Sequence, residues 1–159
     1  MKDIVITLTT QSLALREDNA VLYRCAVSAA AKGAGEENGS FKTPRGRHII
    51  RAKIGAGAPP NTVFVRRRPA GEIYTSQLSA EHPERDWILT RILWLSGCEI
   101  GKNRLGSVDT MRRYIYIHGA PDETPMGKPG SIGCVRMKNA DIITLFEKIP
   151  AGTAVEIRE

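Results

Sequence analysis

The chain has 159 residues, of which 42% are hydrophobic; this size suits one domain with a single core and excludes a second domain of ordinary size. No stretch approaches the roughly 20 apolar residues that a membrane span requires. The start, Met1–Thr10, alternates apolar with polar residues and lacks the unbroken apolar run of a secretory signal. We therefore expect one domain over residues 1–159, without a membrane span, in the cytoplasm, or in the periplasm if a leader has been removed.

The net charge of +6 is concentrated in one part of the chain. Such a basic region can be a solvated surface, a nucleic-acid site or a field that attracts a small polyanionic substrate. Only Phe41 and Phe64 interleave with the cations, too few aromatic residues for a base-stacking platform, so no nucleic-acid partner is expected. Residues 38–71 hold no Asp or Glu and eight basic residues: Lys42, Arg45, Arg47, Arg51, Lys53, Arg66, Arg67 and Arg68.

The first part of the chain predicts a β meander. Apolar and β-branched residues alternate over residues 4–9, which is typical of a strand. Residues 12–16 and 20–27 flank Glu17-Asp18-Asn19, whose residues favour tight turns, so a β-hairpin is expected. The polar segment 28–40 contains three glycines and is predicted to be a loop that could border a substrate groove.

The middle of the chain predicts further strands, over residues 41–54 and 63–65. The pattern over residues 72–85 is weak, and irregular structure with a helical turn is expected there. Residues 87–95 form the most apolar run, which could be a buried strand or a short helix because periodicity alone does not decide. We predict a strand, and another over residues 114–118.

One helix has clear boundaries in the sequence. Asn139 is suited to cap its N-terminus, and Asp141 places an anion in the first turn. We expect the helix to lie over the sheet and to end before the Pro-Ala-Gly of residues 150–152. Its apolar residues repeat at helical spacing: Ile142, Leu145, Phe146 and Ile149.

Two β-rich runs, residues 114–119 and 130–137, each carry a reactive side chain, and the Pro- and Gly-rich segment between them can continue neither strand nor helix. Cys134 follows His118 by 16 residues, so contact between them must come from folding, as for a nucleophile and its base. The pair is a candidate thiol catalyst. The alternative for His118 is a hydrogen-bonded structural histidine.

The other cysteines and histidines are expected outside the site. Cys25 and Cys98 lie in apolar sequence and are interpreted as core residues. The total of three cysteines is odd and no spacing matches Cys-x-x-Cys, which favours a reducing compartment. His48 and His82 are expected at the surface.

Several motifs together resemble the YkuD-type L,D-transpeptidase family. The active-site signature is a strand ending in His118-Gly119, then Ser-x-Gly-Cys-Val-Arg-Met over residues 131–137, with Asn139 and Asp141 shortly after. The resemblance extends to the Thr-Pro-x-Gly turn at residues 43–46 and to the closing strand at residues 150–157, and so spans most of the chain.

The resemblance implies a mainly β sandwich or barrel with one C-terminal helix packed on the sheet. It also implies a peptidoglycan stem tetrapeptide or muropeptide as substrate, cut between its diamino acid and the terminal D-alanine through an acyl-enzyme on Cys134. No cofactor or metal is implied. An amine from a second stem would give a cross-link, a free D-amino acid would give exchange, and water would give L,D-carboxypeptidase action. The missing secretory signal favours a cytoplasmic L,D-carboxypeptidase, with an envelope transpeptidase as the alternative.

Each reactive residue has an expected role. A thiol near pKa ~8.5 is mostly protonated at neutral pH, so Cys134 needs a cation such as protonated His118 to become a thiolate, and the imidazole can later return its proton to the leaving amine. By resemblance, the backbone carbonyl of Gly119 orients the ring. The N–H groups of Gly133 and Cys134 are expected to bind the tetrahedral oxyanion.

Three further residues of the motif have expected roles or consequences. By resemblance Arg136 binds a substrate carboxylate, and its alternative is a structural ion pair, for instance with Asp141. Ser131 is a candidate for substrate binding, or holds the loop through a hydroxyl-to-backbone bond. The family usually has His where this chain has Ile132, which cannot hydrogen-bond and could alter substrate positioning and turnover. A weakened peptidoglycan-binding module is therefore an alternative, although the retained His118 and Cys134 argue against it.

Overall fold

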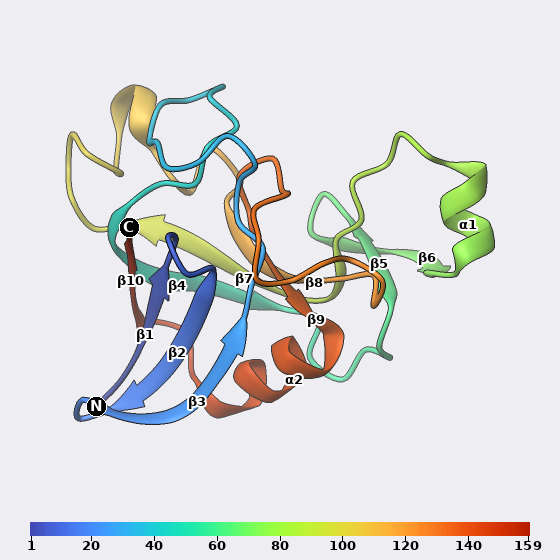
Figure 1. Cartoon of the computed structure of the whole chain (residues 1–159), viewed down its shortest axis with the longest axis horizontal. Coiled ribbons are helices and arrows are strands. Elements are labelled where there is room, and N and C mark those ends of the chain that lie inside the picture. Colours follow the sequence, from blue (N-terminus) through green and yellow to red (C-terminus); the bar gives the residue numbers. More distant parts are fainter.

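Ten strands form one continuous, curled sheet in the computed structural model, which describes residues 1–159, and the longer of two helices packs on that sheet (Figure 1). The mainly β class with a C-terminal helix on the sheet is confirmed. No helix is long and apolar enough to cross a membrane. The elements in chain order are β1 (Lys2–Thr7), β2 (Ser12–Glu17), β3 (Ala20–Ala26), β4 (Gly46–Ile54), β5 (Thr62–Val65), β6 (Arg68–Ile73), α1 (Ser76–Glu81), β7 (Leu89–Gly97), the 3-10 turn η1 (Gly106–Val108), β8 (Tyr116–Ala120), β9 (Val135–Lys138), α2 (Asn139–Lys148) and β10 (Ala154–Arg158).

The predicted meander is present at one edge of the sheet, where β1, β2 and β3 pair antiparallel in sequence order. Glu17 pairs with Ala20, so the β2–β3 loop has two residues, Asp18 and Asn19. Both have positive φ, 49° and 72°, as a type I′ hairpin turn requires. Asn and Asp tolerate this conformation better than most residues, which is why the turn was readable from the sequence.

Strand β7 is the centre of the fold and confirms the strand predicted for the most apolar run. It pairs with β4, β5 and β8, and β8 pairs in turn with β9 in parallel. β10 joins β1 to β4 and links the meander to this part of the sheet. The β7–β8–β9 branch therefore carries both segments of the His–Cys motif on adjacent strands.

The main core lies between the curled sheet and α2. Eighteen buried hydrophobic residues form it, from β1, β2, β4, β7, β8, β9, β10, α2 and the adjoining loops. α2 contributes Ile142, Leu145 and Phe146, as its periodicity predicted. The prediction that Asn139 caps this helix is wrong, because Lys138 occupies the cap position without a side-chain bond and Asn139 is a buried residue of the first turn.

The β5–β6 hairpin and α1 form the end of the molecule away from both chain termini (Figure 1). Strand β6 was not predicted. The hairpin turns through Arg66 and Arg67, both at positive φ (49° and 65°), and arginine gives no turn signal of the kind that Asn-Gly or Asp-Gly gives. α1 is the helical turn expected within residues 72–85, and the Thr75 hydroxyl caps it by accepting a bond from Leu78 N (3.0 Å).

Two surface or core assignments are wrong. His48 was expected at the surface but is 1% exposed, because it points from β4 to the Thr110 hydroxyl, 3.0 Å from its Nε2. Cys98 was expected in the core but is exposed, since it follows the last residue of β7. Cys25 is half-buried against the core, and the side chain of His82 is 43% exposed, as predicted.

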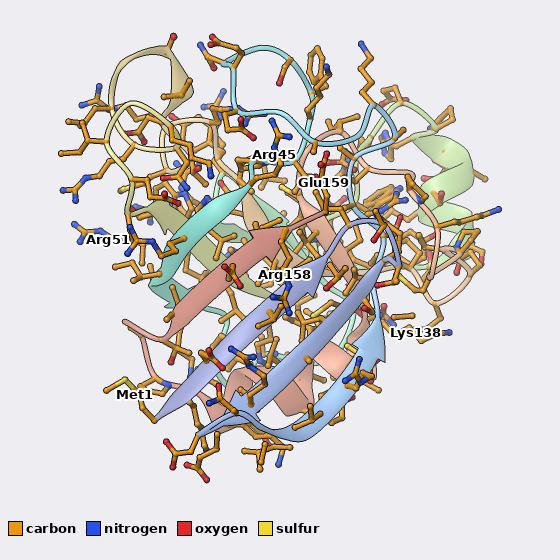
Figure 2. The ribbon with its side chains drawn as sticks, turned by 60° about the vertical axis from the view of Figure 1, so that its left-hand side comes forward. Met1, Arg45, Arg51, Lys138, Arg158 and Glu159 are labelled. Carbon is orange, nitrogen blue, oxygen red and sulfur yellow. The ribbon has the colours of Figure 1, made fainter.

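The basic residues of segment 38–71 do not form one surface. Arg45 pairs with Glu36 (2.9 Å) and Glu159 (3.4 Å), and Figure 2 shows Arg45 beside the C-terminal residue, with Arg51 on another part of the surface. The ammonium of Lys53 donates to carbonyl oxygens at the end of α2. Arg45 and Lys53 therefore make structural contacts within the protein.

Candidate active site

The pairing of β8 with β9 brings the two predicted reactive residues to one face of the sheet. His118 lies opposite Arg136 in the parallel register. Because side chains alternate along a strand, Tyr116 and His118 of β8 share a face with Arg136 of β9 and with Cys134, which directly precedes β9. The alternate positions of this pair of strands, Ile117, Val135 and Met137, are buried in the main core on the other face. The four polar or reactive side chains must therefore point away from that core.

His118 is held in one tautomer. Its Nδ1 lies 2.6 Å from the carbonyl oxygen of Gly119, which can only accept, so Nδ1 carries the proton and Nε2 is free to act as a base. The ring is 1% exposed, and burial lowers its pKa from the usual value. The carbonyl contact expected from the resemblance is thus present, and His118 is a neutral imidazole at neutral pH.

Cys134 directly precedes the first residue of β9 and is half-buried. Its sulfur accepts from Tyr116 N (3.3 Å) and the thiol donates to Tyr114 O (3.4 Å) rather than to His118. Burial raises the pKa of the thiol to about 12. The expectation of a resting thiolate beside protonated His118 is therefore wrong: burial disfavours the charged form of both groups, and the resting pair is neutral.

The loop before Cys134 is fixed by hydroxyl groups. Ser131 is 5% exposed, and its Oγ donates to Cys134 O (2.5 Å) and accepts from Gly133 N (3.2 Å). This is the loop-holding arrangement that the sequence offered as the alternative to substrate binding. Thr43 of the Thr-Pro-x-Gly turn adds a bond from its Oγ1 to Gly133 O (2.9 Å). Of the two expected oxyanion donors, the Gly133 N–H is already bonded, whereas the Cys134 N–H has no partner in the chain.

The guanidinium of Arg136 has no acidic partner. Its Nη2 donates to Ser28 Oγ (2.9 Å), and its buried Nε has no hydrogen-bond partner. The ion pair with Asp141 offered as an alternative is absent, because Asp141 accepts a bond from the Tyr23 hydroxyl instead. Partial burial lowers the pKa of Arg136 and the charge of Asp86 raises it, and a half-buried guanidinium without an ion-pair partner is suited to a carboxylate ligand.

A buried polar network behind His118 was missed by the sequence reasoning. Asn139 Oδ1 accepts from Thr90 Oγ1 (2.5 Å), and its Nδ2 donates to Asn61 Oδ1 (2.8 Å). A Cβ on Gly119 would lie 2.5 Å from Asn139 Oδ1 and 2.5 Å from Leu89 O, so only glycine fits between the network and the strand. Thr90 has φ 77°, unusual for a β-branched residue, within a register shift of β7 against β8.

Cys134 opens into a cavity of about 490 Å³ at the β5–β6 end of the molecule. Arg67 lies over two neighbouring aromatic rings there, 4.9 Å from the centroid of Trp94 and 4.8 Å from that of Tyr114, and donates to the Tyr116 hydroxyl (3.0 Å). Ile132 also lines the cavity and is 58% exposed. The remaining lining residues come from distant segments, which is why sequence spacing did not reveal them: Asn38, Gly39, Phe41, Arg66, Asp86, Ile88, Arg113 and Ile115.

No group of three or more His, Cys, Asp or Glu side chains is arranged to hold a metal ion.

A curled sheet that presents a tautomer-fixed, buried histidine on the same face as a cysteine that lines a cavity defines the class of domain. The model of the YkuD family, described as "L,D-transpeptidase catalytic domain", matches residues 1–157. The chain belongs to this family.

Relatives and solved structures agree with that membership. The chain is 48% identical over 108 residues to "Probable L,D-transpeptidase YbiS" of Escherichia coli (strain K12), a match that covers 65% of this chain and 34% of that protein. The "L,D-transpeptidase from Mycobacterium smegmatis" shares the fold with a TM-score of 0.63 at 15% identity, covering 99% of this chain and 58% of that one. L,D-transpeptidase 3 from Mycobacterium tuberculosis, in complex with a faropenem-derived adduct, has a TM-score of 0.61 at 13% identity, covering 99% and 60%. The chain thus spans about a third of the curated relative and about three fifths of the solved chains.

Proposed function

We propose that this domain is a cysteine L,D-peptidase that cuts peptidoglycan stem tetrapeptides between the diamino acid and the terminal D-alanine, with an acyl-enzyme on Cys134. The observation that carries the proposal is the orientation of His118: Nδ1 is tied to Gly119 O at 2.6 Å, which leaves Nε2 as a base on the face that carries Cys134. Family membership supplies the substrate class.

The neutral resting pair defines how the reaction begins. Nε2 of His118 takes the thiol proton as the sulfur attacks the carbonyl carbon, so the charged pair forms only with substrate in place. The unpaired N–H of Cys134 stabilises the oxyanion. The imidazolium then returns its proton to the nitrogen of the departing D-alanine, the C–N bond breaks, and the thioester remains. Arg136 binds a substrate carboxylate, since it has no acidic partner of its own.

We further propose that water is the usual acceptor, so that the product is the tripeptide and the activity is that of an L,D-carboxypeptidase. Ile132 supports this because its exposed apolar side chain borders the cavity beside Cys134 and cannot hydrogen-bond an incoming amine. Water is small and needs less positioning to attack the thioester.

The test is incubation with a disaccharide-tetrapeptide followed by mass analysis of products, together with treatment by faropenem. We expect tripeptide and free D-alanine, and a covalent adduct on Cys134 but not on Cys25 or Cys98. The matched controls are Cys134→Ser, expected to be inactive, and Cys98→Ser, expected to behave as the parent because Cys98 is exposed but lies outside the cavity. An adduct on another cysteine with Cys134 free would refute the nucleophile, and predominantly cross-linked or exchanged product would favour the transpeptidase.

A further inference from the structure

The cavity beside Cys134 is lined by a single carboxylate, that of Asp86, among three arginines. Two of the arginines make structural contacts: Arg67 lies over the rings of Trp94 and Tyr114, and Arg113 donates to Lys42 O (2.6 Å) and to other oxygens of the loop before it. Asp86 is exposed and has no hydrogen-bond or ion-pair partner in the chain. Asp86 lies near enough to Arg136 to raise the pKa of that guanidinium, but no hydrogen bond or ion pair occupies its carboxylate.

The backbone around Asp86 is firmly held. On one side, Trp87 is 8% exposed and packs edge to face on Tyr74, with ring centroids 5.1 Å apart. On the other side, Arg85 pairs with Glu72 (2.9 Å) and lies over the Trp87 ring. Because both neighbours are anchored, the carboxylate of Asp86 is presented to the cavity from a fixed position rather than from a free loop.

The charge of Asp86 does little for the catalytic pair itself. Burial is the main influence on the pKa values of His118 and Cys134, and the negative charge of Asp86 adds an upward contribution to both. The upward contribution to the imidazole pKa favours proton transfer from the thiol, whereas the upward contribution to the thiol pKa opposes it, so the two effects counteract each other. A role for Asp86 in activating the nucleophile is thus disfavoured, and its charge remains available to a ligand.

We propose that Asp86 is a specificity-determining residue that binds a free primary ammonium group on the acyl donor. This inference rests on the proposed function, in which Cys134 attacks the carbonyl carbon of a diamino acid whose side chain carries a second amine. That amine is a few bonds from the reacting carbonyl, and a carboxylate on the wall of the same cavity is its natural partner. Donors whose side-chain amine is free should therefore be preferred to donors in which it is blocked.

The experiment compares two tetrapeptides that differ only by acetylation of the side-chain amine of the diamino acid. For the parent protein, acetylation should lower kcat/KM for D-alanine release by roughly tenfold, the loss of one charge-assisted hydrogen bond. Asp86→Asn should lower kcat/KM for the free amine to the level of the acetylated peptide and leave the acetylated peptide unchanged. The matched control is Glu84→Gln, which removes an equal charge two residues away, where Glu84 lies 3.7 Å from His82 and outside the cavity.

Different outcomes test the role of Asp86 and the proposed peptidase function. If Asp86→Asn lowers both peptides equally, or if the parent does not distinguish them, Asp86 does not read the amine and the inference is overturned. Acylation of the Asp86→Asn variant by faropenem, which has no amine, should proceed at the parent rate and so report an intact site. A parent that releases D-alanine from neither peptide would overturn the proposed function, and this inference with it.

Discussion

Two features of His118 set the state of its imidazole. Burial keeps the ring neutral by lowering its pKa, and the short contact from Nδ1 to Gly119 O fixes the neutral tautomer with Nε2 as the base. If His118 is the base, these two features predict how acylation depends on pH.

We expect acylation by faropenem to remain fast at mildly acidic pH. The base form of His118 is lost only as the pH falls through its lowered pKa, so the acid limb of the rate profile should lie below the usual ~6.5 of histidine. His118→Ala should reduce the rate at least ~100-fold at every pH, the usual contribution of a general base. His82→Ala, on the surface, is the control. An acid limb centred at or above 6.5, or a His118→Ala variant that acylates normally, would contradict the assignment.

Ile132, which lines the cavity beside Cys134, leads to a prediction about product choice. Replacing it by His places a hydrogen-bonding ring at the cavity wall beside Cys134, where an acceptor amine must arrive. Ile132→His should therefore raise the ratio of transferred to hydrolysed product, measured with one tetrapeptide donor and a fixed amine acceptor. Ile132→Val, which changes volume but not polarity, is the matched control. If the parent already transfers more than it hydrolyses, Ile132 does not set the outcome.

At the scale of elements, the sequence predicted those strands and turns whose signals are local. The β2–β3 turn was readable because Asp-Asn favours positive φ, and the apolar run of β7 because its burial leaves no room for polar residues. Strand β6 was missed because its hairpin turns through Arg66-Arg67, where the fold imposes positive φ on residues without that preference. Tertiary structure decided the turn, not propensity.

The site shows the same division between local and long-range information. Motif spacing and family resemblance brought His118 and Cys134 together, and the parallel β8–β9 register agrees. The protonation state of the pair was mispredicted, because burial by elements distant in the sequence sets the pKa values. Asn139 was predicted to cap the helix because asparagine is a common cap residue. In the structure its side chain is instead part of the buried network, where it hydrogen-bonds to Thr90 and Asn61.

His48 links β4 to the loop before β8, and this contact predicts how stability depends on pH. Burial lowers its pKa from 6.5 to about 4, so the folded state holds it neutral. The stability it contributes is fully present above pH 6.5, where the unfolded chain is also neutral. It is lost between pH 6.5 and about 4, where the unfolded chain binds a proton that the folded chain does not, by about 3 kcal/mol in total.

Urea unfolding at several pH values measures this loss. His48→Gln removes the titration, so its free energy of unfolding should vary less between pH 6.5 and 4 than that of the parent, even if the variant is less stable at neutral pH. His82→Gln should keep the parental slope because His82 is on the surface. Equal slopes in the parent and His48→Gln would show that His48 is not the group that titrates.

At the scale of the whole molecule, the net charge of +6 acts on substrate only through the cations that face the cavity. Arg45 and Lys53 are neutralised or bonded elsewhere, whereas Arg66 lines the cavity and has no partner of its own. An anionic donor should therefore be steered to the site, and its second-order rate constant should fall as salt rises, because screening at physiological ionic strength acts beyond about 8 Å.

Arg66→Gln should reduce that rate constant roughly twofold at low salt, the effect of one charge about 10 Å away in water, and should flatten its salt dependence. Arg51→Gln removes the same charge from a part of the surface outside the cavity, so it should leave the salt dependence unchanged. A parental rate that does not change with salt would assign the basic residues of segment 38–71 to solubility rather than to substrate attraction.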